Sequence, residues 1–498
     1  MTSTFFGLNI ALSALTAQQR ALEITAHNVA NANTEGYTRQ EADMVAGRPF
    51  PTPIAAVAGQ AGQLGTGVDV AMIRRLRDTF LDSQVRSQVG SLGYWETRQD
   101  YIEQIEVVFN EPSDEGVNNL LTKFWKAWQD LASNPESYAA RVSVVESATV
   151  LASVIQRDYG LLQGLRSQAD EEIEANLRQV NDWLAEIASL NKQIGAVEAQ
   201  VASDFDPNVK VAKAQANDLR DRRDLLLDKL SRTLKVGYRE ESDGTVTVWL
   251  GDPASPQILV QADTRRYLLH QSMGAPVWDL DGDIATMDGA DAIVQDGELK
   301  GLLELRDEML DVGHTGGIAN RLNALAEAII DLVNGLHAGG HGLDGTTGLP
   351  FFGDGVNPST GAADIQVNPT LLANANKVGA ASAAGQPGNG DQAGAIASAL
   401  QSQMVTIDGR ATTIGDWYRA MIAQLGIDGQ QAVDMKTNQG LLVDRLTKNR
   451  ESFSGVSLDE EAANVIRFER AYQAAARVMN AMDELLEQLV TGVGIVGR

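Results

Sequence analysis

Two histidines have the spacing of a helical metal site. His337 and His341 stand four residues apart, which on a helix would place both imidazoles on one side as zinc ligands. Gly339, Gly340 and Gly342 lie between and beside them, and so many glycines disfavour a helix. No third ligand is in view either. We therefore interpret these histidines as structural residues.

Three aspartates form the second candidate site. Asp279, Asp281 and Asp283 alternate along the chain as the first ligands of a calcium-binding loop do. Such a loop carries glycine at its sixth position and glutamate at its twelfth, where this chain has Ile284 and Ala290. An acidic turn is the better interpretation.

Catalytic motifs are missing from the sequence. It contains no Gly-x-Ser-x-Gly, His-Glu-x-x-His or phosphate-binding-loop pattern. His27, His270 and His314 stand apart from any matching nucleophile. The chain has no cysteine, which excludes disulfides, thiolate metal ligands and a cysteine nucleophile. We expect no enzymatic activity, no cofactor and no metal.

The charge of the chain argues against nucleic acid as a partner. The 498 residues carry a net charge of −26, and such a field repels phosphate backbones. The longest basic patch, formed by Arg74, Arg75 and Arg77, is too short to offset it. We attribute the acidity to solubility.

Neither a membrane span nor a cleaved signal peptide is expected. No stretch approaches the roughly 18 uncharged apolar residues that cross a bilayer. Residues 1–19 carry no charged side chain, whereas a secretory signal places Lys or Arg before its apolar run. We interpret this segment as the start of a helix that doubles as an export signal of another type.

The two ends of the chain carry the clearest helical patterns. Apolar residues alternate steps of four and three at each end, as in the seam of a coiled coil. The N-terminal seam contains Leu8, Leu12, Leu15, Gln19, Leu22, Ala26 and Val29. The C-terminal seam contains Val465, Phe468, Tyr472, Ala475, Met479, Met482, Leu486 and Leu489. Ser457 and Glu460 form a capping box that predicts where the last helix begins.

The interior alternates between helical and β-type segments. Residues 40–68 are predicted to be irregular, 68–73 a short strand, and 76–234 helical with a turn at Asp206-Pro207-Asn208. Short β-type runs fill 236–298, helix returns near 299, 339–392 are rich in loops, and helix resumes from 393. The clearest internal seams are Ile173, Leu177, Val180, Leu184, Ile187, Asn191 and Ile194, and Ile318, Leu322, Leu325, Ile329, Leu332 and Leu336.

These patterns predict a mainly α protein with a β-rich insert. Its parts are terminal coiled-coil helices that pair the N- and C-termini, a long-helix core domain, and a small β-rich outer domain. Each buried seam residue contributes about 1.5–3 kcal/mol, so the terminal helices need a partner. They could pack on their own chain, or pair with each other and with neighbouring subunits. Gln19, Ala26 and Ala475 leave shallow points in the seams, which favours the second alternative.

The residues that follow the N-terminal seam resemble a known motif. The run from residue 28 to 40, preceded by Ala-Leu-Ser-Ala-Leu at 11–15, is similar to the N-terminal signature of flagellar rod, hook and hook-associated proteins. Its motif residues are Asn28, Asn31, Asn33, Gly36 and Tyr37. Many members have proline where this chain has Glu35, but Gly36 still permits the positive φ of a turn.

Two later stretches narrow this resemblance. Residues 455–464 (Gly-Val-Ser-Leu-Asp-Glu-Glu-Ala-Ala-Asn) and 467–478, which include Ala-Tyr-Gln-Ala, are similar to the C-terminus of the hook-associated protein 1 family. Residues 298–307 resemble the helix that re-enters the core domain in that family. A hook or rod protein of the same superfamily is the alternative. The chain is short for the family, which indicates a reduced outer domain.

The resemblance implies a structural subunit at the junction between flagellar hook and filament. Such proteins are exported through the flagellar type III apparatus without signal cleavage, and outside the cell they self-assemble into a ring or short helical array. Implied partners are the hook protein, the second junction protein (hook-associated protein 3), and a cytosolic chaperone that holds the C-terminal helix before export.

It also implies a division of the chain and an interface. Residues 1–40 and 455–498 would supply the helices of an inner, tube-forming domain, 41–235 and 299–454 the core domain, and 236–298 the outer domain. The expected subunit-interface residues are Leu8, Leu12, Leu15, Leu22, Val29, Val465, Phe468, Tyr472, Met479, Met482, Leu486 and Leu489.

Overall fold

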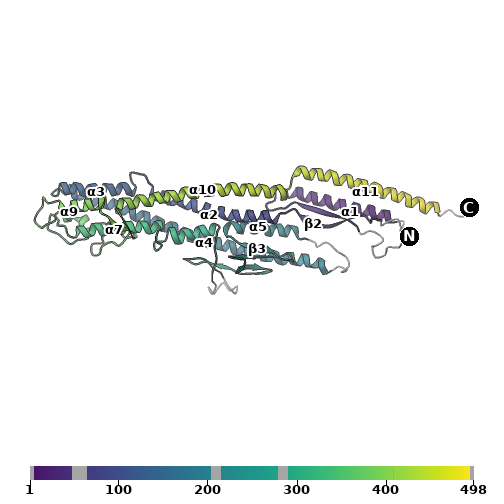
Figure 1. Ribbon diagram of the computed structural model, residues 1–498, viewed down its shortest axis with the longest axis horizontal. Helices are drawn as coiled ribbons and strands as arrows, with labels where there is room; N and C mark the ends of the chain where they lie inside the picture. The colour runs from purple at the N-terminus through teal and green to yellow at the C-terminus, as the bar shows by residue number, and fades with distance from the viewer. Residues whose placement is uncertain (1–4, 48–63, 204–214, 279–289, 408, 494–498) are drawn as a thin grey trace.

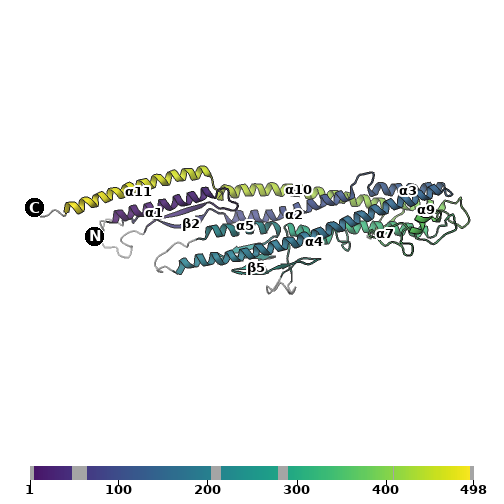
Figure 2. The same ribbon diagram turned by 180° about the vertical axis from the view of Figure 1, so that it is seen from behind.

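The computed structural model is a long rod of helices with both ends of the chain at one tip (Figure 1). It describes residues 5–47, 64–203, 215–278, 290–407 and 409–493. The aspartates at 279, 281 and 283 and the turn predicted at 206–208 lie outside these residues. The terminal helices run side by side at the tip, and a loop-rich region closes the far end (Figures 1 and 2).

Helices make up most of the described chain, as the sequence predicts. They are α1 (Phe6–Ala30), α2 (Thr79–Phe109), α3 (Val117–Ser133), α4 (Tyr138–Ser203), α5 (Asn217–Thr233), α6 (Glu298–Glu304), η2 (Leu305–Met309), α7 (Ile318–His337), α8 (Pro369–Ala373), η3 (Ala375–Lys377), α9 (Asp391–Ser402), α10 (Ile414–Ser454) and α11 (Leu458–Val493). The strands are β1 (Gln40–Ala46), β2 (Val68–Arg75), β3 (Gly237–Glu240), β4 (Val246–Leu250), β5 (Gln257–Gln261), β6 (Thr264–Arg265), β7 (Leu268–Leu269), β8 (Val277–Trp278), β9 (Ala290–Asp291), β10 (Val405–Ile407) and β11 (Arg410–Thr412).

The 66-residue helix α4 is the central structural element of the rod. Every member of its predicted seam, from Ile173 to Ile194, is buried, so that pattern is confirmed. Asn191 is the one polar member of the seam. Its side-chain amide donates to the backbone oxygens of Val246 and Ala262, and its carbonyl oxygen accepts from the Val246 N–H. The seam is therefore polar where it attaches the β-rich segment.

The predicted β-rich segment forms two small antiparallel sheets against α4. One has the strand order β3-β4-β5-β6 and the other β7-β8-β9. Val246, Val248 and Leu259 belong to the same apolar core as α4, so the sheets share the core of the rod. The segment leaves and rejoins the helices at one point, where the Lys235 N–H donates to the backbone oxygen of Asp296.

The prediction that residues 40–68 are irregular is wrong in part. Residues 40–46 form β1, which pairs antiparallel with β2 in a two-stranded ribbon. Gln40, Ala42 and Met44 alternate with acidic Glu41 and Asp43, a mixed pattern that hides the strand in the sequence. The strand expected at 68–73 is confirmed as β2.

The far end of the rod carries the predicted loop-rich segment. Residues 339–392 contain isolated β-bridges and the short elements α8 and η3. They cover the apolar stripe of α7, in which Ile318 to Leu332 are buried and Leu336 is half-buried. The prediction of a continuous helix from residue 393 is wrong, because the hairpin β10–β11 separates α9 from α10.

Helix α10 runs from the loop-rich end back toward the tip and packs antiparallel to α2. Glu106 lies against Gly429, and Leu92 lies against Gly440 further along. Thr413 caps the start of α10 by accepting the Asp416 N–H, and Asp78 caps α2 by accepting the N–H groups of Phe80 and Leu81. The two helices connect the far end of the rod to its tip.

Among the described residues, one helix qualifies by length and composition alone as a membrane span, contrary to expectation. Within α4, the segment 138–199 contains a window that is long and apolar enough to cross a bilayer. Many apolar residues of its first half pack into the shared core beside α3, as those of a core helix do; among them are Val144, Val145, Leu151, Ala152 and Ile155.

Candidate assembly interface

The terminal helices pair with each other, as predicted. Helices α1 and α11 run antiparallel, because Gly7 lies against Met482 at one end and Asn28 reaches Glu461 at the other. Val465, Phe468, Met479, Met482 and Leu486 are half-buried on the side of α11 that carries these contacts. Tyr472 is 38% exposed, and Leu489 lies in α11 with its side chain outside the description.

Helix α1 turns a different face to its own chain than the seam suggests. Its buried residues are Ala11, Ala17, Ala21, Ile24, Thr25 and Asn28, which are mostly small and pack toward α11 and the β1–β2 ribbon. Of the seam residues, Leu12 is 53% exposed and Val29 is 43% exposed. Leu8, Leu15 and Leu22 are half-buried. The large side chains of the seam are thus only partly covered by the monomer.

The motif residues form the turn that leads from α1 to β1. Asn28 is buried, and its amide donates to the Gln40 backbone oxygen at 2.9 Å and to Glu461 at 3.3 Å. Its carbonyl oxygen accepts the Tyr37 hydroxyl at 2.7 Å and the Gln40 N–H at 3.0 Å. Gly36 has φ of 78°, the positive value expected from the sequence. Asn28 therefore joins the turn, the ribbon and α11.

The other motif residues have smaller roles. The Asn31 amide donates to the backbone oxygen of His27, which closes the end of α1, and its own oxygen accepts the Thr34 hydroxyl. Asn33 is exposed. Burial, together with Asp218 and Asp221, raises the pKa of Tyr37 well above its usual value, so its hydroxyl stays protonated and donates to Asn28.

Arg39 fastens the same turn to the start of α11. Its guanidinium lies 2.7 Å from Glu461 and 2.5 Å from Glu460, and its backbone N–H donates to Ser454 at the end of α10. The Ser457 hydroxyl accepts the Glu460 N–H at 3.5 Å, so the predicted helix start is confirmed. The Glu460 carboxylate is used for Arg39, a partner that the capping-box pattern does not reveal.

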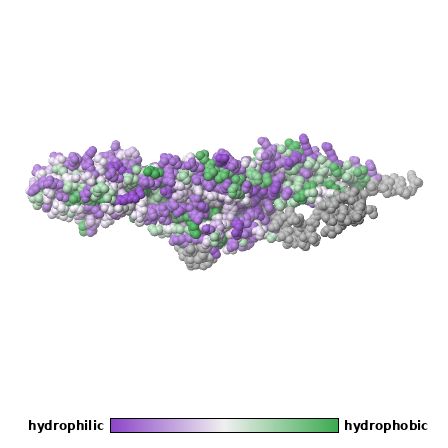
Figure 3. All heavy atoms as spheres, in the orientation of Figure 1, coloured by the Kyte–Doolittle hydropathy of each residue, from purple (hydrophilic) through white to green (hydrophobic). Residues whose placement is uncertain are grey.

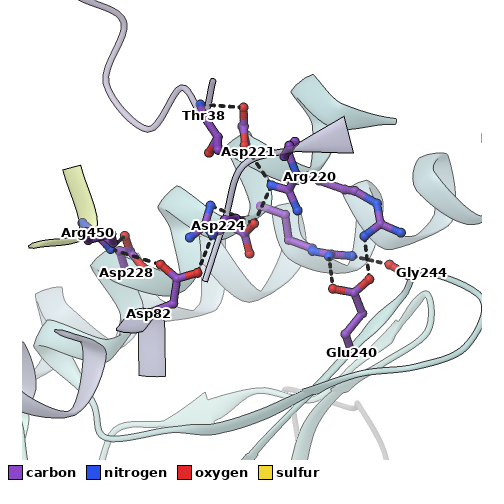
Figure 4. A network of polar contacts seen from close by, with 12 residues as sticks. Thr38, Asp82, Arg220, Asp221, Asp224, Asp228, Glu240, Gly244 and Arg450 are labelled. Carbon is purple, nitrogen blue, oxygen red and sulfur yellow. Dashed lines mark hydrogen bonds and ion pairs between the residues drawn. The ribbon is translucent and has the colours of Figure 1, made fainter. Parts of the chain in front are cut away.

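A buried network of charges lies directly behind this turn (Figure 4). Asp224 of α5 contacts Arg75 of β2 at 2.7 Å and Arg77 at 3.0 Å, and Arg86 of α2 lies 3.6 Å away. Burial alone would raise the pKa of Asp224, but Arg77, Arg75 and Arg86 outweigh it and hold that pKa far below its usual value. The carboxylate is therefore charged.

The network extends to both terminal segments. Asp221 accepts the Thr38 N–H at 2.9 Å and contacts Arg75 at 2.8 Å. At the other side, Arg450 of α10 contacts Asp228 at 2.8 Å, and Asp228 also binds Arg86 at 2.6 Å. These contacts join α2, α5, α10, the ribbon and the motif turn where the terminal pair meets the rod. In the sequence, Arg75 and Arg77 stand out only as part of a short basic patch.

The structure describes only some of the residues that the sequence offered as metal ligands. His337 is buried at the end of α7, where Nε2 accepts the Gly379 N–H and Nδ1 donates to the Leu349 oxygen, so both ring nitrogens serve the backbone. Within the described ranges, no group of three or more His, Asp or Glu side chains is arranged to hold a metal ion.

Comparisons with known proteins cover both the ends and the middle of the chain. Residues 102–352 match a family described as the flagellar hook-associated protein FlgK helical domain. Residues 8–38 match the flagella basal body rod protein family, and 449–491 match the C-terminal family of the basal body rod FlgEFG proteins. The last two matches coincide with α1 and its turn and with α11.

Curated relatives align over the full chain. Flagellar hook-associated protein 1 of Bacillus subtilis is 34% identical over 100% of both chains, and that of Escherichia coli is 23% identical over 97% of this chain and 99% of its own. The solved structure of the flagellar hook junction protein FlgK from Burkholderia pseudomallei superposes with a TM-score of 0.61 at 16% identity, covering 75% of this chain and 100% of that one, which shows a shared fold. On the full-length identity, the chain belongs to the flagellar hook-associated protein 1 family.

Proposed function

We propose that this chain joins the flagellar hook to the filament as a structural subunit, and that the α1–α11 pair is its assembly element. The observation that carries the proposal is the incomplete burial of both helices. Leu12, Val29, Val478 and Leu485 are between 43% and 58% exposed, and Glu461 alone is buried among the α11 residues whose burial is described. Exposed apolar faces of this kind are typical of surfaces that bind other proteins.

The partners, the export route and the domain division expected from the sequence belong to the same proposal. Neighbouring copies, the hook protein and hook-associated protein 3 are the partners of the terminal pair outside the cell. Before export through the type III apparatus, a cytosolic chaperone covers α11. Residues 1–40 and 455–498 form the inner, tube-forming domain, with residues 41–235 and 299–454 as the core domain and 236–298 as the outer domain. The full-length relatives favour this role over that of a hook or rod protein.

Phe468→Asp tests the assembly role. It places a charge in the half-buried face of α11, where an unpaired carboxylate is costly, while leaving the buried core of the rod intact. We expect normal expression, loss of the protein from flagella, flagellin released into the medium, and cells that do not swim. Removal of residues 456–498 should have the same effect.

Asn480→Asp is the matched control. Asn480 is exposed on α11 away from α1, so the same added charge should leave swimming and incorporation unchanged. Quantitative blotting of purified flagella measures incorporation for both variants. Wild-type incorporation of the Phe468→Asp chain, or of the chain without residues 456–498, would refute the proposal.

A further inference from the structure

Helix α11 carries a second apolar seam. It steps by four and three residues from Arg467, and its members are Ala471, Ala474, Val478, Ala481 and Leu485. Val478 is 47% exposed and Leu485 is 58% exposed, so the monomer leaves this seam open. At about 100° per residue, it lies slightly more than a quarter turn from the seam that faces α1. Figure 3 shows apolar residues gathered over the terminal pair.

Helix α1 has a corresponding open face. Leu8, Leu12 and Leu15 lie slightly more than a quarter turn from the residues that face α11, such as Gly7 and Ala11. Each open face is rotated about its helix axis away from the residues that contact the other helix. Counted toward higher residue numbers, this rotation is positive on α1 and negative on α11. Because the helices are antiparallel, these rotations place the open faces on opposite sides of the pair. One copy therefore cannot bring its two open faces together.

The two open faces lie at the same height along the pair. The contacts Gly7–Met482 and Asn28–Glu461 join residues whose numbers add to the same total, so they define one antiparallel register. In that register Leu8 is level with Ala481 and Leu15 with Ala474, and Leu12 is within one residue of Val478. Leu8 and Leu15 are thus level with alanines on the other side, and Leu12 is nearly level with the larger Val478.

Charge complementarity extends the match. Glu23 borders the open face of α1 and is exposed, and its described partners are two residues of the same helix, Gln19 at 3.2 Å and exposed Arg20 at 3.9 Å. In the same register it is within one residue of Arg467, which begins the second seam of α11. Arg467 is exposed and stacks on Phe468, and it borders a groove of about 520 Å³ between α11 and β1. No acidic side chain within the described ranges forms a salt bridge with it.

We propose that the open face of α1 in one copy docks on the second seam of α11 in the next copy, with little axial shift between them. This inference rests on the assembly function proposed above and adds the two surfaces that meet. The contact joins unlike surfaces on opposite sides of the subunit, so repeating it generates a ring or a shallow helix and not a closed dimer. Glu23 of one copy then faces Arg467 of the next.

Cysteine cross-linking in assembled flagella tests the docking, because the chain itself has no cysteine. Leu12→Cys combined with Val478→Cys should give a ladder of covalent oligomers on a non-reducing gel after mild oxidation. The matched control is Leu12→Cys with Asn480→Cys, which is at almost the same height but turned away from the seam. A disulfide needs Cα atoms within about 7 Å, so we expect roughly tenfold more ladder from the first pair.

The outcomes separate the docking from the function on which it rests. Flagella that contain the Leu12→Cys/Val478→Cys chain but yield no ladder, or one no stronger than the control's, overturn the docking and leave the assembly function standing. The assembly function itself would fail if the chain without residues 456–498 entered flagella.

Charge exchange gives a second measurement that does not depend on cysteine. Glu23→Arg and Arg467→Glu should each lower incorporation into flagella, because like charges then face each other across the contact. The double exchange should restore it. Within one subunit these residues lie on opposite sides of the pair, so rescue requires contact between copies. Failure of the double exchange to restore incorporation contradicts the proposed docking.

Discussion

At the scale of single residues, the motif turn shows how one side chain can join distant segments. Asn28 uses both ends of its amide at once, with Tyr37 and Gln40 nearby in sequence and Glu461 at the other end of the chain. The sequence identified Asn28, Gly36 and Tyr37 by resemblance alone. It could not reveal the partner Glu461, because nothing local to residue 28 indicates a contact with the last helix.

Asn28→Asp tests this residue with almost no change in shape. The substitution removes the amide donor and places a carboxylate beside Glu461 in a buried site, so we expect a loss of about 2 kcal/mol or more in the free energy of unfolding. Denaturant unfolding followed by circular dichroism measures it. Asn33→Asp, an exposed change in the same turn, should have little effect. Equal stability of both variants would show that the Asn28 contacts contribute nothing.

A second residue-scale prediction concerns His337. Burial beside Trp128 and Phe351 lowers its pKa to about 4, although the Leu349 oxygen acts in the opposite direction. An unfolded histidine has a pKa of about 6.5, so the unfolded chain binds the proton first. The contribution of His337 to stability is therefore fully present above pH ~6.5 and falls by about 3 kcal/mol as the pH approaches 4.

The comparison of wild type with His337→Gln isolates this effect from the many carboxylates. The difference in unfolding free energy between the two proteins should shrink as the pH is lowered from 7 to 4.5. A difference that does not change over this range would show that His337 titrates with an ordinary pKa.

At the scale of elements, helices with one strong seam were predictable and mixed elements were not. The seam of α4 is buried as expected, because a long run of apolar residues at helical spacing leaves one solution. The strand β1 was not predicted, because its residues alternate weakly and its partner β2 begins 22 positions after β1 ends. The second seam of α11 was not predicted either, because alanine is too common in helices to indicate an interface.

Asp224→Asn tests the joint between α2, α5 and the ribbon. It removes the charge that compensates Arg75, Arg77 and Arg86, and breaking one member of a buried ionic cluster typically costs about 3–5 kcal/mol. Thermal unfolding of the purified protein measures this loss. Asp263→Asn removes an exposed 4.0 Å contact with Lys192 and should cost less than about 1 kcal/mol. A small effect of Asp224→Asn would mean that the cluster carries no net stability.

At the scale of the whole molecule, burial divides the chain into a rod and a tip. α4 presents a long buried seam, whereas α11 rests on α1 with half-buried residues only beyond Glu461. The sequence indicated the pairing of the two ends, because seams at both termini need partners. How much of each helix the pair would cover could not be predicted, since coverage depends on which face of α1 turns inward.

Hydrogen exchange should reveal this division. We expect the amides of α11 in the purified monomer to exchange at least about a hundredfold faster than those of α4, because local opening of the tip exposes little apolar surface. In assembled flagella the α11 amides should become protected. Equal protection of α4 and α11 in the monomer would mean that the terminal pair is already complete without neighbours.

The hydrogen bond between Lys235 and Asp296 places the exit and the return of the β-rich segment side by side. Because the two ends of the segment are held together, a longer or shorter loop between its strands need not change the spacing of α5 and α6 or the geometry of the tip. The loops of this segment can therefore change in length between related chains while the terminal pair stays the same, provided that the strands packed on α4 are kept.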